Sequence, residues 1–189
     1  MNIFFFGGSF DPPHKGHFEI VSKCAKLSDK LIIFPNKISL EKKVNVESKH
    51  RINMLKFMVN QNNIEIDDFE IRSNKKNYTL YTVEYLFKKY INHNITMVIG
   101  FDQLENIHNW YKSMDYINRI NILCFNRNGK KSKNISINIK NINYINDFSC
   151  NISSSLIRKK LAKNEGCDLD NLLPRKIIEY IKQNGLYVA

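Results

Sequence analysis

Residues 2–27 read NIFFFGGSFDPPHKGHFEIVSKCAKL, and this stretch determines the fold class that the sequence predicts. Residues 2–6 form a short apolar run closed by two glycines, which is typical of a buried strand that ends in a tight turn. Apolar residues then recur at helical spacing from Phe18 to Leu27. The chain is therefore expected to open with a strand, a glycine turn and a helix.

The same alternation continues along the chain. We expect further strands over residues 31–34, 64–71, 95–100, 120–125 and 135–145, and helices over 51–59, 79–91, 110–117, 153–162 and 174–183. Isoleucine alternates with polar residues over 135–145, which indicates a half-exposed strand at a sheet edge. The pattern predicts an α/β fold, a Rossmann-like and mostly parallel sheet with helices on both faces, plus C-terminal helices. In such sheets ligands bind beyond the carboxyl ends of the strands, where the strand order reverses.

Length and composition set broad limits. The 189 residues are 43% hydrophobic and 25% charged, which fits one globular domain over 1–189 and excludes a wholly disordered chain. No run is long enough to span a membrane, and the first ten residues lack the basic leader of a signal peptide, so we expect a cytoplasmic protein. The four cysteines show no C-x-x-C spacing, so we expect reduced thiols and neither a zinc site nor a disulfide framework.

The formal net charge of +11 leaves the partner open. A polyanion such as nucleic acid or a nucleotide would fit, but the bias toward lysine, asparagine and isoleucine is also what coding DNA rich in A and T produces. The basic segment 127–134 has no periodicity and is expected to be a solvated loop.

The segment GGSFDPPHKGH, residues 7–17, carries the clearest chemical signal. Three glycines and two prolines within eleven residues turn the backbone tightly beside a helix N-terminus, which makes an anion site. His14 and His17 flank that site, and two imidazole donors suit phosphoryl or nucleotidyl transfer. The alternative is that both are half of a metal site or ordinary helix-start residues. Asp11 could approach a metal or cap the turn, and we favour the cap; the spacing does not match G-x-G-x-x-G, which disfavours a hydride-transferring enzyme.

A second segment, NISSSLIRKKL at residues 151–161, places three hydroxyls at the start of a helix. Ser153 stands in a good capping position and Arg158 is expected in the first turn, so hydroxyls, backbone N–H groups and a guanidinium could converge on one phosphate. Taken alone, this pattern is also that of a common structural cap.

Together the two segments resemble the H-x-G-H and I-S-S-x-x-I-R signatures of the nucleotidylyltransferase superfamily. Within it, the sequence is similar to the bacterial-type nicotinate (nicotinamide) mononucleotide adenylyltransferases. Further stretches fall in that family's order: PNK at 35–37, RINML at 51–55, NYTLYTVEYL at 77–86, VIGFDQLENIHNW at 98–110 and YIKQNGLY at 180–187. The resemblance covers nearly the whole chain.

The resemblance implies a role for each matching position. The ATP-binding set would be Gly8, Ser9, Phe10, His14, His17, Ser153, Ser154 and Arg158, and the catalytic set His14, His17, Lys42 and Arg158. Thr79, Asp102 and Trp110 would form the mononucleotide half of the pocket, although Trp110 could equally be a core residue. The implied cofactor is Mg²⁺, held mainly by phosphates and water.

The implied reaction is attack of the 5′-phosphate of nicotinate mononucleotide on the α-phosphorus of ATP, giving deamido-NAD and pyrophosphate. The choice between nicotinate and nicotinamide mononucleotide stays open, as does a homo-oligomer. Alternatives are another adenylyltransferase of the superfamily, such as the phosphopantetheine enzyme, and, more remotely, a non-catalytic basic protein that binds nucleic acid.

Three positions depart from the family pattern. The chain has SLEK at 39–42 where P-P-H-K is usual, so Lys42 keeps a charge but the shape of the loop is in doubt. Tyr81 replaces a common aspartate. Ser155 stands where threonine is usual, which keeps the hydroxyl.

Overall fold

Six strands form one sheet in a computed structural model of the chain, which describes residues 1–37, 46–74, 76–126, 138–163 and 168–188. The strands are β1 (Asn2–Gly8), β2 (Lys30–Pro35), β3 (Ile64–Ile66), β4 (Asn94–Gly100), β5 (Asn121–Phe125) and β6 (Ile142–Ile145). Their order is β3-β2-β1-β4-β5-β6, and every neighbouring pair is parallel. The predicted α/β fold with a parallel sheet is confirmed.

The strand order reverses between β1 and β4. From β1 the chain moves outward to β2 and β3, and it then returns to the other side of β1 to build β4, β5 and β6. Connections that leave β1 and β4 in opposite directions open a crevice at the carboxyl ends of these two strands.

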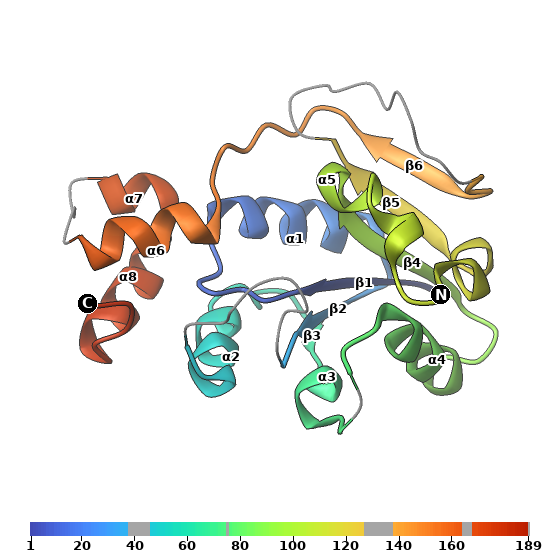
Figure 1. The fold of residues 1–189 in the computed structure, drawn as a ribbon, viewed down its shortest axis with the longest axis horizontal. Coiled ribbons are helices and arrows are strands. Elements are labelled where there is room, and N and C mark those ends of the chain that lie inside the picture. The colour runs from blue at the N-terminus through green and yellow to red at the C-terminus, as the bar shows by residue number, and fades with distance from the viewer. Residues whose placement is uncertain (38–45, 75, 127–137, 164–167, 189) are drawn as a thin grey trace.

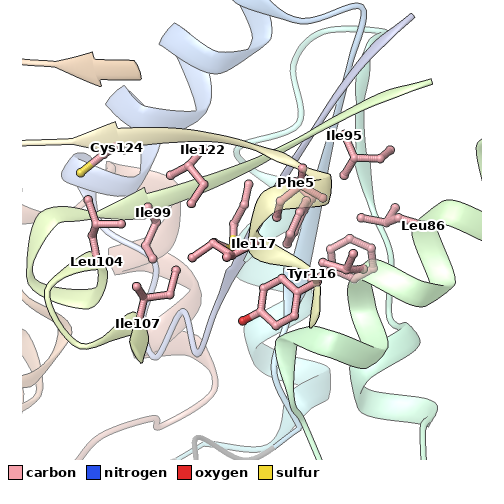
Figure 2. Close-up of a cluster of buried hydrophobic side chains, with 14 of the residues drawn as sticks. Phe5, Leu86, Ile95, Ile99, Leu104, Ile107, Tyr116, Ile117, Ile122 and Cys124 are labelled. Carbon is pink, nitrogen blue, oxygen red and sulfur yellow. The ribbon is translucent and has the colours of Figure 1, made fainter. Parts of the chain in front are cut away.

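Alternation along β1 divides the core between the two faces of the sheet. Phe4 and Phe6 pack with α1 (Lys15–Leu27) and α2 (Ser48–Lys56) on one face. Phe5 packs on the other face with α4 (Thr79–Lys89) and α5 (Phe101–Leu104). Figure 2 shows Phe5 beside Ile95, Ile99 and Ile122 of the neighbouring strands, with Leu86, Leu104, Tyr116 and Ile117 closing over them. Each such buried side chain contributes roughly 1.5–3 kcal/mol, so both faces anchor the strand that leads into the glycine turn.

Three C-terminal helices gather at one end of the molecule, at the left of Figure 1. They are α6 (Ser154–Ala162), α7 (Leu169–Leu172) and α8 (Arg175–Gln183). Ile157, Leu173, Ile177 and Ile181 form a cluster of their own, to which α2 contributes Met54. Phe18 of α1 also packs against this cluster, so the C-terminal helices attach to the sheet through α1 and α2.

The segment predicted as an interrupted strand over 64–71 is mostly not a strand. β3 ends at Ile66, and residues Phe69–Arg72 form the short helix α3. Asp67 Oδ1 accepts a hydrogen bond from the Phe69 N–H at 2.9 Å, which turns the backbone, and the Phe69 ring stacks on Tyr85 of α4 at 4.2 Å. The polar turn residue interrupts the apolar run, which is why the strand prediction was wrong there.

The helix predicted over 110–117 is also wrong. The structure has three 3-10 turns, η1 (Ile107–Asn109), η2 (Ser113–Asp115) and η3 (Ile117–Arg119), and Trp110 between the first two is extended. Lys112 adopts a left-handed conformation with φ of +48°, which a continuous helix excludes.

The remaining elements agree with the prediction to within a few residues, except at the sheet edge. There β6 is confined to Ile142–Ile145, so the strand expected over 135–145 is shorter within the part that the structure describes. β6 is the last strand in the sheet order and is partly exposed, which confirms an edge strand. Residues 127–134 and 135–137 lie outside the described residues.

Three cysteines, Cys24, Cys124 and Cys150, are buried free thiols, as expected. Burial raises the pKa of Cys24 and of Cys124 to about 12, so these thiols stay protonated. Cys167 lies outside the described residues. Among the helices that are described, none is long and apolar enough to cross a membrane.

Candidate functional site

A cavity of ≈ 490 Å³ opens at the carboxyl ends of β1 and β4, where the strand order reverses. Gly8 at the end of β1 and Gly100 at the end of β4 both line it. Its place is the one that the alternation of strands and helices predicted for a ligand.

The glycine turn, residues 9–14, follows β1 directly; because β1 includes Gly7 and Gly8, the turn begins after these glycines and not at them as predicted. Phe10 is 2% exposed and has a φ of +49°, and its ring packs edge-on against Phe6 at 5.4 Å and His17 at 5.0 Å. A Cβ on Gly8 would lie 3.1 Å from the Phe10 ring, so a side chain there would press on this buried ring. Gly8, Ser9 and His17 line the cavity, while Phe10 lies behind them and supports the His17 ring.

His14 and His17 form one unit at the start of α1. Their rings stack with centroids 3.7 Å apart, and the His14 backbone N–H donates to His17 Nδ1 at 3.2 Å. Because Nδ1 accepts this bond, the hydrogen-bond network assigns the proton of a neutral His17 to Nε2. His17 can thus donate from Nε2 without a doubly protonated ring. His14 is 3% exposed and does not line the cavity, whereas His17 does.

The glycine between the two histidines is fixed by packing. A Cβ on Gly16 would overlap the Sγ atom of Cys150 and would approach the His14 ring at 3.2 Å. The first turn of α1 therefore rests directly on Cys150, a contact that no sequence pattern indicated.

Arg51 stabilises the backbone of the same turn through hydrogen bonds. Its fully buried guanidinium donates to the main-chain oxygens of Ser9 at 2.6 Å and Asn36 at 2.7 Å, and its Nε donates to Val46 at 3.2 Å. Burial lowers the pKa of Arg51, although the negative charge of Asp11 opposes this effect. Arg51 therefore links the residue that follows β1 to the residue that follows β2. The sequence analysis named Arg51 only as part of the RINML stretch.

The serine segment, residues 151–161, contacts the glycine turn, although more than 130 residues separate the two in the sequence. Ser153 caps α6 by accepting a hydrogen bond from the Leu156 N–H at 3.2 Å. Ser154 Oγ donates to the Pro12 carbonyl at 2.9 Å, and Arg158 Nη1 donates to the Asp11 carbonyl at 2.6 Å. The cap at Ser153 is confirmed, whereas Arg158 lies in the second turn of α6 and not in the first.

These three residues do not line the cavity itself. Ser154 and Arg158 contact the backbone of Pro12 and Asp11, whereas the Ser153 hydroxyl is used in the cap of α6. Their predicted contact with the triphosphate stays a prediction.

The opposite wall of the cavity is aromatic and polar. Thr79 at the start of α4, Asp102 in α5 and Trp110 all line it, so the structure brings together the three residues predicted for the mononucleotide. Tyr78 and Tyr111 stack on one another at 4.3 Å beside Trp110. Trp110 also packs partly on the core, so both interpretations of this residue hold in part.

A buried carboxyl group lies in the same wall and was missed. Glu70 is 8% exposed, lines the cavity and accepts a hydrogen bond from the Thr82 hydroxyl at 2.7 Å. Burial raises the pKa of Glu70 to about 7, and the hydrogen bond from Thr82 lowers it by a smaller amount. The sequence offered little signal, because Glu70 fell in a segment read as strand.

Two further predictions concern charge and metal. Lys42, with its SLEK segment, lies outside the described residues. Within the ranges that the structure describes, no three His, Cys, Asp or Glu side chains are grouped to hold a metal ion.

Comparisons with known proteins identify the family. The model of the cytidylyltransferase-like family matches residues 5–160. A probable nicotinate-nucleotide adenylyltransferase of Borrelia turicatae is 33% identical, covering 100% of this chain and 98% of the relative. The Bacillus subtilis nicotinate-nucleotide adenylyltransferase is 29% identical, covering 96% of each chain.

Solved structures show the same fold. The nicotinic acid mononucleotide adenylyltransferase of Plasmodium falciparum, complexed with NaAD, superimposes with a TM-score of 0.84 at 22% identity, covering 98% of this chain and 97% of the other. The family model and the full-length relatives settle the classification: the chain belongs to the cytidylyltransferase-like family and, within it, to the nicotinate-nucleotide adenylyltransferases.

Proposed function

We propose that the protein transfers the adenylyl group of ATP to the 5′-phosphate of nicotinate mononucleotide, giving deamido-NAD and pyrophosphate. The observation that carries this proposal is the junction of the two signature segments beside a cavity with an aromatic far wall. The names of the relatives support nicotinate over nicotinamide as the base.

The cavity offers a separate place for each substrate. Gly8, Ser9 and His17 present backbone N–H groups, a hydroxyl and an imidazole on the β1 side, where ATP phosphates would lie. Trp110 and Thr79 lie on the other side, where a pyridine ring can stack on the indole face. A volume of ≈ 490 Å³ is within the range of small-molecule sites.

The reaction requires the protein mainly to position the two substrates and to supply positive charge near the phosphates. An oxygen of the mononucleotide phosphate attacks the α-phosphorus, the bond from that phosphorus to the bridging oxygen breaks, and pyrophosphate leaves with the electron pair. Because the nucleophile is already anionic, no covalent enzyme intermediate is needed.

Three side chains and one helix N-terminus would supply the stabilising groups. His17 Nε2 would donate to the α-phosphate, the thirteen-residue helix α1 presents its N-terminus to the same region, and His14 orients the His17 ring. Arg158 and Lys42 would hold the outer phosphates. Removing one such donor typically lowers turnover by about 10²–10³-fold.

We further propose that Mg²⁺ enters with ATP, bound mainly to phosphate oxygens and water. This ion keeps several waters and needs one or two protein ligands at most, so it requires no resident cluster of side chains. Bound in this way, it would neutralise charge on the leaving pyrophosphate.

A panel of acceptors tests the proposal. Pyrophosphate release from ATP and Mg²⁺ is measured with nicotinate mononucleotide, nicotinamide mononucleotide and phosphopantetheine, each offered separately at the same concentration. We expect strong preference for nicotinate mononucleotide and a loss of at least about 10²-fold in His17→Ala. Turnover only with another acceptor, or near-normal activity in His17→Ala, would overturn the assignment.

A further inference from the structure

The end of the chain reaches the glycine turn. Tyr187 Oη donates a hydrogen bond to Asp11 Oδ1 at 2.7 Å, across 176 residues of sequence, and Asp11 is 2% exposed. Burial and the negative charge of Asp11 raise the pKa of Tyr187, so its hydroxyl keeps the proton that it donates.

The sequence NGLY at 184–187 produces this contact. After α8 the Gly185 N–H donates to the Lys182 carbonyl at 3.3 Å and the Leu186 N–H to the Ile181 carbonyl at 3.0 Å, a Schellman motif with Gly185 at φ +56°. The chain reverses there, and Tyr187 at φ +63° turns its ring back onto the turn after β1. The chain reversal after α8 therefore places the Tyr187 hydroxyl against the Asp11 carboxylate.

Arg158 also contacts Asp11. Arg158 Nη1 donates to the main-chain oxygen of Asp11 at 2.6 Å but stands 3.9 Å from carboxylate Oδ2. A direct charge-assisted hydrogen bond would measure about 2.8 Å. The guanidinium is thus held by a neutral carbonyl, while the carboxylate beside it is turned toward Tyr187.

We propose that Tyr187 is a positioning residue for ATP: its hydroxyl holds the Asp11 carboxylate away from Arg158, so that the guanidinium charge stays available to the triphosphate. This inference rests on the proposed function, in which Arg158 binds the triphosphate. Without the hydroxyl, the buried carboxylate can move about 1 Å closer to the Arg158 guanidinium and form a direct ion pair, and an arginine paired in this way attracts phosphate less.

Tyr180 provides a matched control within α8. Its hydroxyl lies 3.0 Å from His50 Nδ1 and accepts a hydrogen bond from Asn53 Nδ2 at 3.1 Å, so it joins α8 to α2 without touching the turn. Tyr180→Phe and Tyr187→Phe each remove one hydroxyl that links the C-terminal helices to the rest of the protein, but only the second removes a contact to Asp11.

The test is calorimetric titration of each variant with ATP and Mg²⁺ in the absence of mononucleotide, followed by the KM of each substrate. We expect Tyr187→Phe to weaken ATP binding about tenfold and to leave the KM of nicotinate mononucleotide unchanged. Tyr180→Phe should change ATP binding less than about twofold. Asp11→Asn in the Tyr187→Phe background should restore ATP binding, because an amide carries no negative charge to neutralise the guanidinium.

Normal ATP binding in Tyr187→Phe, an equal loss in Tyr180→Phe, or a double variant no better than Tyr187→Phe would each overturn the inference. The titration does not depend on the acceptor. If the wild-type protein bound ATP but made no deamido-NAD, the proposed function would fail while the role of Tyr187 would still be decided by the binding data.

Discussion

Replacing the buried carboxyl group of Glu70 by an amide should stabilise the protein in a pH-dependent way. Burial raises the pKa of Glu70 from its ordinary value of 4.5 to about 7. Below pH 4.5 the group is protonated in both folded and unfolded chains, so it costs nothing. Between pH 4.5 and 7 it ionises only in the unfolded chain, and folded stability falls as pH rises; above pH 7 the loss is complete.

The size of the loss follows from the two pKa values. Their difference corresponds to about 3 kcal/mol of unfolding free energy at pH 8. Glu70→Gln has no charge to bury and keeps a carbonyl oxygen for the Thr82 hydroxyl, which now donates at 2.7 Å. We therefore expect Glu70→Gln to exceed the wild type by about 3 kcal/mol at pH 8, or roughly 6–12 °C in Tm for a chain of this size, and to match it at pH 4.5.

Thermal unfolding at pH 4.5, 6 and 8 measures this difference. Glu84→Gln is the matched control, because Glu84 is exposed on the same helix as Thr82 and its substitution should leave Tm nearly unchanged at each pH. A Glu70→Gln variant that is no more stable than the wild type at pH 8, or equally stabilised at all three values, would refute the reasoning.

Three other substitutions test the packing of the site. Gly16→Ala should cost roughly 1–3 kcal/mol in thermal unfolding, since its Cβ overlaps Cys150 Sγ, and Cys150→Ala in that background should regain most of the loss; no regain would contradict the contact. Arg51→Lys keeps the charge but not the planar fork that serves Ser9 and Asn36, so Tm should fall by an amount equivalent to about 2 kcal/mol, and an unchanged Tm would exclude the bracing role. Trp110→Ala should raise the KM of the mononucleotide up to about tenfold with little change for ATP, whereas Trp110→Phe should keep most of the affinity; equal changes in both KM values would argue against stacking.

Local signals accounted for most of the fold and for the position of the cavity. The apolar run before Gly7 and Gly8 marks a buried strand whether or not its neighbours are known, and parallel strands bring their carboxyl ends to one edge. The turn and the serine segment were found because each carries residue types at fixed spacing within one short stretch. That they meet, through Ser154 and Arg158, is what the structure adds.

The residues that were missed act through long-range contacts. Arg51 reaches the carbonyl of Ser9, 42 residues away, and nothing near Arg51 in the sequence indicates that partner. Glu70 could not be identified because it follows a polar turn that, in the sequence, resembles an interrupted strand. Tyr187 reaches Asp11 only because the chain reverses after α8. Likewise, the left-handed Lys112 could not be read from a lysine, which has no intrinsic preference for that conformation.

The most direct test of the central claim is a crystal structure of the protein with deamido-NAD. The account predicts the dinucleotide in the cavity at the ends of β1 and β4, with its pyridine ring against Trp110 and a phosphate oxygen within hydrogen-bond distance of His17 Nε2. A dinucleotide bound outside this cavity, or one whose pyridine ring lies away from Trp110 and whose phosphates do not reach His17, would contradict it.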